Sequence, residues 1–495
     1  YHPTHLPAAI QRNILENPGW YTAYTPYQAE IAQGRLEAVL NFQTVVCELT
    51  AMPLANASLL DESTAAAEAM SMLFSLRTST QKKTEANQFF VDNNILPQTL
   101  AVLQSRANPI GIELIQGEVD DWQPTSDCFG AIFQYPGKYG QLIDLQAAID
   151  KAKSLEIKTT VAADIMSLVL LEAPGTYGAD VVVGSTQRFG VPMGFGGPHA
   201  GYFATKTEYK RSVPGRIIGI TQDKQGNHAL RMALQTREQH IKRDRATSNI
   251  CTAQVLLAVM AGMYAVHHGP EGLRQLARRI HNHTITLYKG LVKLGIDVCN
   301  TTFFDTLQIS CSTGVVQKEA LSRGVNLNII GDHHMSISIS ELTTDSDIDE
   351  LIHIFSSSKT TSPKVPLEPV GIPTSMQRST PYLTQDVFYY YQSESAMMRY
   401  IKQLERKDLS LTHSMIALGS CTMKLNAAAE LLPLSRPEWG NIHPFAPMDQ
   451  VQGYQHILRE LENDLSEITG FAATSLQPNS GAQGEFSGLM VIRSY

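Results

Sequence analysis

The sequence predicts an α/β protein with a mostly parallel sheet, a smaller α/β domain after it, and the beginning of a second copy of the first domain. Three observations support this prediction. Short apolar segments alternate with helical segments between residues 89 and 183, which is typical of parallel strands joined by helices. A long helical stretch at 252–295 precedes the strand-like segments of a smaller unit. A pattern near residue 33 recurs 419 positions later.

The chain is expected to divide into five parts. Helices are predicted at 31–50, 64–76, 145–155 and 486–495. Strands or short apolar segments are expected at 89–91, 101–103, 112–115, 130–133, 159–163, 180–183, 303–310 and 336–339. The predicted parts are an irregular N-terminal arm (1–30), a large domain (31–295), a small α/β domain (296–355), a linker rich in Ser, Thr and Pro (356–384), and an arm with the truncated start of a second large domain (385–495).

Composition narrows the class of protein. The net charge of −8 argues against nucleic acid or an anionic membrane as the main partner. No apolar segment reaches the roughly 18 residues of a membrane span. The six cysteines are far apart and form no C-x-x-C pair, so neither a disulfide framework nor a metal site is predicted. Both ends look like cuts in a longer protein, so a targeting peptide cannot be judged.

The internal repeat determines the predicted architecture. Gln33-Gly34 recurs as Gln452-Gly453, and Glu48-x-Thr50 recurs as Glu467-x-Thr469 at the same offset. Between these pairs one apolar helical face recurs in register: Val39, Phe42, Val46 and Leu49 correspond to Leu458, Leu461, Leu465 and Ile468. Further on, Ser63-x-Ala65-x-x-Glu68 matches Ser480-x-Ala482-x-x-Glu485 at offset 417, which predicts a two-residue slip in the preceding loop.

One chemistry that this layout suits is pyridoxal phosphate, which needs a lysine, an acid for the ring nitrogen and a helix N-terminus for the phosphate. Asp164 follows a predicted strand and could be that acid, although an N-capping aspartate at a strand-to-helix turn is the favoured reading. The next strand end, where cofactor-bearing relatives of this layout carry their Schiff-base lysine, holds Gln187. Neither an amide nor the always protonated Arg188 can form a Schiff base.

A phosphate site is predicted in the second copy instead. Ser480, Gly481, Ala482, Gln483 and Gly484 precede a helix, and small residues let the backbone approach an anion. The first copy has Asp61-Glu62 in the same place, and these carboxylates would repel a phosphate.

Other motifs allow more than one interpretation. Lys424 is a possible Schiff-base lysine, although it precedes the phosphate loop, and Cys421 is more often an inert thiol than a nucleophile. The basic segment 237–245 is interpreted as a solvated or interdomain surface, with a docking patch for an acidic partner as the alternative.

Several long motifs closely resemble the glycine decarboxylase (P protein) family of the glycine cleavage system, and the resemblance covers essentially the whole chain. They are Tyr24-Thr25-Pro26-Tyr27-Gln28, Asn56 to Glu62, Gln187 to Pro192 with Gly196-Gly197-Pro198-His199, Ala246 to Gln254, Gly419 to Lys424, and Gln477 to Glu485.

The resemblance implies a tandem pair of fold-type I pyridoxal-phosphate domains, the first non-catalytic and the second holding the cofactor. It implies decarboxylation of glycine, with transfer of the aminomethyl group to the lipoyl group of the H protein, by a protein that forms a homodimer. It also implies an active-site arm with Cys421, Thr422, Lys424 and His443. The family's cofactor lysine lies beyond this chain, so the chain alone is expected to be inactive.

Two alternatives remain open. One is a non-catalytic scaffold that docks the lipoyl protein or a cofactor-bearing partner. The other is a different fold-type I decarboxylase, against which the tandem repeat counts. The location would be mitochondrial in a eukaryote and cytoplasmic in a bacterium.

Overall fold

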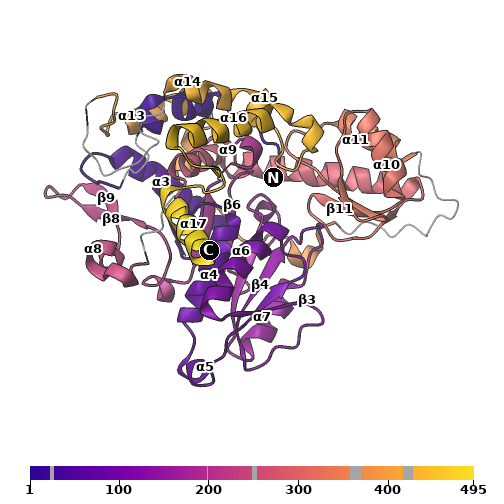
Figure 1. Cartoon of the computed structure of the whole chain (residues 1–495), viewed down its shortest axis with the longest axis horizontal. Coiled ribbons are helices and arrows are strands. Elements are labelled where there is room, and N and C mark those ends of the chain that lie inside the picture. The colour runs from indigo at the N-terminus through magenta and orange to yellow at the C-terminus, as the bar shows by residue number, and fades with distance from the viewer. Residues whose placement is uncertain (23–26, 198, 248–252, 357–370, 414, 416–426) are drawn as a thin grey trace.

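The large domain is built on a seven-stranded sheet, seen below the centre of Figure 1. The computed structural model describes residues 1–22, 27–197, 199–247, 253–356, 371–413, 415 and 427–495. The strand order is β1-β7-β6-β5-β4-β2-β3. Strands β2 to β6 run parallel, whereas β7 is antiparallel to β6 and to β1. The strands are β1 (Leu54–Ala55), β2 (Gln88–Asp92), β3 (Glu113–Gly117), β4 (Cys128–Tyr135), β5 (Lys158–Ala163), β6 (Val181–Ser185) and β7 (Gly201–Thr205).

Helices cover both faces of this sheet, because alternate residues of its buried strands point into two separate cores. On β6, Val182 faces the core that contains α3 and α9, whereas Val181 and Val183 face the core that contains α4 and α6. The apolar segment 101–103 lies within a helix and not a strand. The helices of the large domain are α3 (Gln33–Thr50), α4 (Glu62–Ser75), α5 (Ser79–Lys83), α6 (Pro97–Ala107), α7 (Leu145–Lys153), α8 (Gln239–Lys242) and α9 (Val255–Lys293).

The small domain is a four-stranded antiparallel sheet with two helices, on the right of Figure 1. Helix α9 leads into it and contacts both β10 and α11. The backbone of α9 leaves helical geometry at Gly269 (φ 61°), directly before Pro270, so a kink divides the helix. The elements of the small domain are β10 (Asp297–Val298), β11 (Thr306–Ser310), α10 (Thr313–Ser322), β12 (Asn328–Ile330), β13 (His334–Ser338) and α11 (Asp345–Ser356).

Two segments are more ordered than the sequence predicted. The arm contains α1 (Ala8–Ile10), a π-helical turn (Gln11–Leu15) and α2 (Pro18–Tyr21). The end of the predicted linker packs on the large domain. Here Arg378 donates to the carbonyl oxygens of Glu48, Leu49 and Leu168, and these bonds hold the segment against α3. No described helix is both long and apolar enough to cross a bilayer.

The second copy repeats the first at a constant offset of 419. Helices α12 (Val387–Tyr390) and α13 (Glu394–Glu405) precede this repeat. Helix α15 (Pro437–Gly440) then matches α2, α16 (Gln452–Thr469) matches α3, and α17 (Gly481–Ser494) matches α4, with equal lengths in each pair. A further short helix, α14, spans Ala428–Leu431.

The predicted slip to offset 417 is wrong. Asp61 caps α4 by accepting from the Thr64 N–H, and Ser480 caps α17 by accepting from the Gln483 N–H. These matched caps set Asp61, and not Ser63, opposite Ser480.

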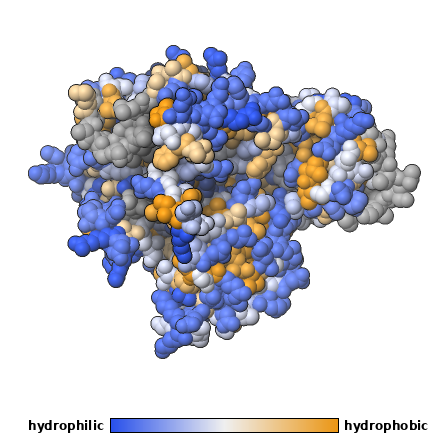
Figure 2. All heavy atoms as spheres, viewed as in Figure 1, coloured by the Kyte–Doolittle hydropathy of each residue, from blue (hydrophilic) through white to orange (hydrophobic). Residues whose placement is uncertain are grey.

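The apolar face of the second copy is exposed where that of the first is buried. Phe42 and Leu49 of α3 are fully buried, whereas their counterparts Leu461 and Ile468 are 44% and 79% exposed. Figure 2 shows a hydrophobic cluster over α17, whose exposed side chains include Phe486, Leu489, Val491 and Ile492. These helices present an apolar surface that nothing in the described chain covers.

The start of α3 is fastened by the arm of the second copy. Asp408 accepts from the backbone N–H groups of Gly34 (2.6 Å) and Arg35 (3.0 Å) and from Arg35 Nη1 (2.7 Å). A Cβ on Gly34 would lie 1.9 Å from the Leu404 carbonyl oxygen, so only glycine lets α13 approach this closely. Within the described part of the chain, no neighbouring group lies within 4 Å of such a Cβ at the counterpart Gly453.

We therefore expect Gly34→Ala and Gly453→Ala to have opposite effects. The first should lower the free energy of unfolding by about 1–3 kcal/mol, because a backbone carbonyl must move. The second should be neutral or raise it by up to about 1 kcal/mol, because alanine favours helix over glycine. Urea denaturation of the two variants measures this, and equal losses would contradict the close approach.

Candidate functional site

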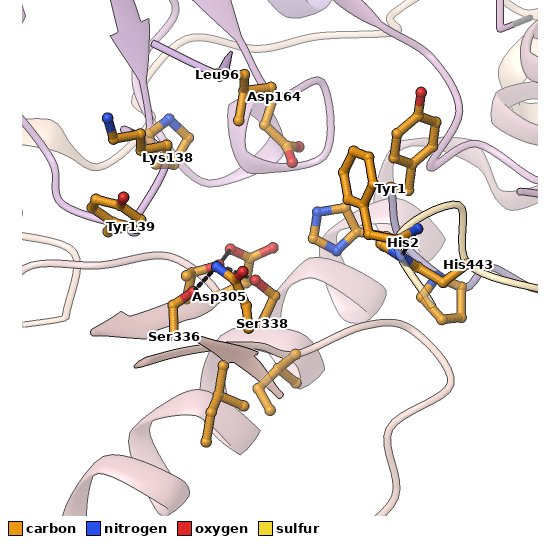
Figure 3. A pocket seen from close by; sticks show the side chains of 18 of the residues that line it. Tyr1, His2, Leu96, Lys138, Tyr139, Asp164, Asp305, Ser336, Ser338 and His443 are labelled. Atoms are coloured by element: carbon orange, nitrogen blue, oxygen red, sulfur yellow. Dashed lines mark hydrogen bonds between the residues drawn. The ribbon is translucent and has the colours of Figure 1, made fainter. Parts of the chain in front are cut away.

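A cavity of about 1210 Å³ lies between the large and small domains. It opens at the carboxyl ends of β4, β5 and β6, where open α/β sheets bind ligands. Figure 3 shows the side chains around it, which come from the arm, from both domains and from the second copy: Tyr1 and His2, Leu96, Lys138, Tyr139 and Asp164, Asp305, Ser336 and Ser338, and His443. This cavity is the first copy's equivalent of a cofactor pocket.

Gln187, in the position predicted for the lysine, holds the N-terminal arm. Its Oε1 accepts from the backbone N–H of His2 (2.9 Å), and its Nε2 donates to the His2 carbonyl oxygen (2.8 Å). Nε2 also donates to the carbonyl oxygen of Val191 (2.8 Å). The side chain is 3% exposed and all its hydrogen-bonding atoms are used. The residue therefore acts as a clamp on the backbone of the arm, a role that an amide fills and a lysine cannot.

Asp164 has the capping role that the sequence favoured. One oxygen, Oδ1, accepts from the backbone N–H groups of Met166 (2.7 Å) and Ser167 (3.0 Å) in the turn after β5. The other, Oδ2, lies 2.6 Å from Arg188 Nη1. Because both oxygens are engaged, this carboxylate is not free to pair with a ring nitrogen.

Arg188 joins the two domains through a second carboxylate. Its Nη1 lies 2.5 Å from Asp305 Oδ2, in the segment that leads into β11 of the small domain. The two carboxylates raise the pKa of Arg188, although burial alone would lower it. Burial raises the pKa of Asp305, and the Arg188 charge opposes that rise.

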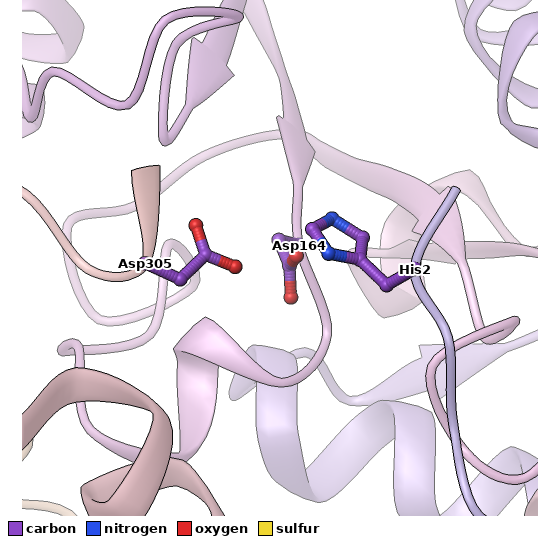
Figure 4. A group of neighbouring side chains, drawn as sticks. All are labelled: His2, Asp164 and Asp305. Carbon is purple, nitrogen blue, oxygen red and sulfur yellow. The ribbon is translucent and has the colours of Figure 1, made fainter. Parts of the chain in front are cut away.

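Figure 4 shows Asp164 and Asp305 beside His2, and the three ligand atoms lie within 4.8 Å of one another. This grouping resembles a metal site, but the Arg188 guanidinium already pairs with both carboxylates.

The N-terminus of α4 does not suit a phosphate. Asp61 occupies the N-cap, and Glu62 stands at the first helical position. Burial, followed by the nearby charge of Asp164, raises the pKa of Glu62 to about 7. Within the described residues, Glu62 Oε1 and Gln134 Oε1 are buried acceptors without a hydrogen-bond partner. The first-copy cavity thus lacks a lysine at the end of β6, a free acid for the ring nitrogen and a phosphate turn, and it does not fit pyridoxal phosphate.

The N-terminus of α17 has the opposite character. Ser480 caps the helix, and the first turn has no charged side chain; Gly481, Ala482 and Gly484 are small, and Gln483 is its one longer side chain. Backbone N–H groups and a hydroxyl are the donors that a phosphate prefers. The predicted turn Ser480 to Gly484 therefore fits a phosphate, but it does not line the first-copy cavity.

The predicted active-site arm is only partly described. Cys421, Thr422 and Lys424 lie outside the described residues. His443 lines the first-copy cavity, with its ring 5.9 Å from that of Tyr1 and 5.5 Å from that of Phe445. The described residues bring His443 to the first copy's cavity, and its role toward the second copy's cofactor stays a prediction.

Sequence reasoning missed Asp305 and Glu62 as parts of this electrostatic network. Asp305 is a single acid ahead of a strand in another domain, and no local pattern marks it. Glu62 was noted only for its charge, although its place directly after the N-cap could have indicated partial burial.

We expect Arg188→Met to destabilise the protein by about 3–5 kcal/mol, because the buried Asp305 and the half-buried Asp164 would remain as uncompensated charges. Arg274→Met is the matched control: its ion pair with Glu271 is surface-exposed, and its loss should cost about 1 kcal/mol or less. Adding Asp164→Asn and Asp305→Asn to Arg188→Met should recover most of the loss. Thermal or urea unfolding measures the stability of all three variants. If Arg188→Met lost no more stability than Arg274→Met, the ion pairs of Arg188 with Asp164 and Asp305 would be contradicted.

Glu62→Gln should make the protein more stable than the wild type at pH 8 and about equal to it near pH 4.5. The folded state raises the pKa of Glu62 from 4.5 to about 7. It therefore favours the protonated acid, and the wild type loses this contribution as the pH rises through 7. The expected difference at pH 8 is about 2 kcal/mol, less than the full shift because the side chain is partly exposed. Unfolding curves of both proteins from pH 4.5 to 8.5 measure it, and a constant difference would contradict the raised pKa.

Known proteins match this chain over its whole length. The family model "Glycine cleavage system P-protein" matches residues 1–355. The chain is similar to a glycine dehydrogenase (decarboxylating) of Christiangramia forsetii, with 59% identity over 100% of this chain and 52% of the relative. It is also similar to one of Flavobacterium johnsoniae, with 61% identity and the same coverage. The chain thus spans about half the length of the curated relatives that it matches.

Solved structures agree with the fold. A crystal structure of glycine decarboxylase (P-protein) of the glycine cleavage system in inhibitor-bound form has a TM-score of 0.65 and 31% identity, over 72% of this chain and 82% of that chain. A C-DES mutant with glycine covalently linked to its PLP cofactor has a TM-score of 0.51 at 12% identity, over 71% and 94%, and shows the fold alone. The predicted fold-type I pyridoxal-phosphate fold is confirmed. By the family model and the solved relative together, the chain belongs to the P-protein family of the glycine cleavage system.

Proposed function

We propose that this chain is the first half and the beginning of the second half of a glycine decarboxylase that transfers an aminomethyl group. The observation that carries the proposal is that two copies of one fold, aligned at a constant offset, differ at the positions that a cofactor needs. At the same offset, the first copy has Asp61-Glu62 at a helix start where the second has Ser480-Gly481. The first copy also uses Gln187 as a clamp on its arm. The relatives' names supply the reaction.

In this proposal the first copy is a scaffold, and the second holds pyridoxal phosphate. The donors at the start of α17, from Ser480 to Gly484, would hold the phosphate, while the lysine comes from sequence beyond this chain. When bound, the cofactor withdraws electrons from the glycine α-carbon, which favours the loss of CO2. The aminomethyl group then passes to the lipoyl group of the H protein, and the working protein is a homodimer.

The repeat supports an active-site role for the segment that contains Cys421. At offset 419, His2 corresponds to Cys421 and His5 to Lys424. His2 lines the first-copy cavity, where Gln187 holds its backbone. If both copies place this segment alike, Cys421, Thr422 and Lys424 line the second copy's pocket, where the thiol, hydroxyl and ammonium can bind or orient glycine. His443 is assigned to the same arm.

The proposed reaction can be tested on the parent protein, prepared with pyridoxal phosphate. We expect release of labelled CO2 from carboxyl-labelled glycine when a lipoyl acceptor is present. Ser480→Asp, which imitates the first copy, should lower cofactor affinity at least tenfold, because a carboxylate at the phosphate position repels it. The charge-neutral Ser480→Thr should keep binding within a few fold. Absence of CO2 release from the wild type would refute the proposed reaction.

This chain should not itself form a specific lysine adduct with the cofactor. After incubation with excess pyridoxal phosphate and reduction with borohydride, mass spectrometry should find no stoichiometrically labelled lysine, because Gln187 occupies the lysine position. Stoichiometric labelling of Lys424 would overturn this assignment.

A further inference from the structure

A compact lobe of the large domain carries the opposite charge to the rest of the chain. Residues 206–245, here called the basic lobe, contain ten lysines and arginines and four aspartates and glutamates. Their net charge is +6 within a chain of −8, so the remaining residues carry −14. The basic lobe includes the hairpin of β8 (Ile218–Gln222) and β9 (His228–Met232), which projects at the left of Figure 1, and α8.

The basic lobe is held together and is fixed to the body. Arg237 donates to the carbonyl oxygens of Val213 and Gly215, which ties the segment before the hairpin to the segment after it. Gln33 of α3 forms two hydrogen bonds with the backbone of Leu230 in β9 (2.9 Å each). Gln43 of α3 bonds the backbone of Ile218 in β8 in the same way. The charges therefore stand on a defined scaffold and not on a loose tail.

The outward charges of the basic lobe form no ion pairs with the described residues of the chain. The inner cations have acidic neighbours: Lys206 pairs with Asp180 (2.6 Å), and Arg216 lies 4.0 Å from Glu238. Seven further cations are exposed, and in the described part of the chain none of them forms an ion pair; they are Lys210, Arg211, Lys224, Arg231, Lys242, Arg243 and Arg245. The exposed acids of the basic lobe number three, Glu208, Asp223 and Asp244, and Asp223 is occupied by bonds from Gln225 and Asn227.

Two apolar side chains stand among these cations. Ile220 on β8 is 65% exposed, and Ile241 on α8 is 52% exposed. Arginines around isolated apolar anchors are typical of a protein interface. The described residues of the basic lobe have no exposed Phe, Tyr or Trp for stacking on bases, and a long polyanion would meet the −14 of the remaining chain. These features favour a compact acidic protein over nucleic acid.

We propose that the basic lobe is the docking surface for a protein partner with an acidic face. Given the proposed function, on which this assignment of the partner rests, the partner is the protein that carries the lipoyl acceptor, because that protein must arrive and leave in each cycle. Charge complementarity of this kind speeds encounter and selects the partner, and salt weakens it.

Binding tests the docking surface without reference to activity. The probe is the lipoyl-carrying protein, titrated against this chain by calorimetry at 20 and 300 mM salt. We expect a dissociation constant that rises on the order of tenfold or more with salt, and a similar rise at low salt in Lys224→Glu/Arg231→Glu and in Arg243→Glu/Arg245→Glu. The control is Lys82→Glu/Lys83→Glu, which reverses two exposed lysines on α5 and should bind like the wild type.

Three outcomes would overturn the docking surface: no binding by the wild type, equal binding by the basic-lobe and control variants, or tighter binding of a DNA duplex than of the lipoyl protein at 150 mM salt. Circular dichroism of each variant separates lost binding from lost folding. Lys224→Glu/Arg231→Glu changes the β8–β9 hairpin, and Arg243→Glu/Arg245→Glu changes the turn after α8. If one of these double variants fails to fold, the other still tests the docking surface.

Activity of the parent protein separates this proposal from the proposed function. With free lipoamide as acceptor, CO2 release tests the reaction alone, since lipoamide has no protein surface to dock. In the basic-lobe variants, KM for the lipoyl protein should rise at least tenfold without a matching rise in KM for lipoamide. Salt-sensitive binding that depends on the basic lobe, without any glycine decarboxylation, would uphold the docking surface and refute the reaction. Glycine decarboxylation with an unchanged KM for the lipoyl protein in the basic-lobe variants would uphold the reaction and refute the docking surface.

Discussion

The contact between Arg188 and its two carboxylates organises the first copy. Nη1 lies 2.6 Å from Asp164 and 2.5 Å from Asp305, so one guanidinium ties the end of β5 to the small domain. Buried charges are stable only when they are paired. The arrangement of the two domains, the turn after β5 and the shape of the cavity therefore depend on one another. A site that would hold a cofactor in an active copy is here a structural joint.

Most of the fold followed from local patterns. The helices at α3, α4 and α9 and the strands at β4, β5 and β6 lie where apolar periodicity predicted them, because each buries one face or both in a core. The apolar segment 101–103 belongs to a helix that starts at Pro97, where proline suits the first turn. The loop slip was wrong because identical letters were matched. The structure shows that the N-cap geometry of Asp61 and Ser480, and not residue identity, sets the register.

Some residues of the candidate site could be predicted from the sequence, and others could not. Gln187 and the pair Asp61-Glu62 could be found from sequence, since each occupies a strand end or a helix start with a known chemical requirement. Asp305 and Asp408 could not, because their partners, Arg188 and Arg35, are more than a hundred positions away and nothing local distinguishes them from other surface acids. The structure also shows His443 on the first copy's cavity, a contact between copies that no pattern within either copy encodes.

The hydrogen bonds made by Gln187 help explain why a copy that has lost its cofactor lysine does not regain it. The amide satisfies both the backbone N–H and the carbonyl oxygen of one residue in the arm, His2. A change back to lysine would leave the His2 N–H without its acceptor and bring a second cation beside that of Arg188, while Asp61 and Glu62 would still repel a phosphate. Restoring the lysine alone is therefore unfavourable, and removing the two acids alone brings no cofactor binding. Cofactor binding would return only if both changes were made together. Evolution by single substitutions therefore has no easy path back, and a duplicated copy, once converted in this way, stays a scaffold.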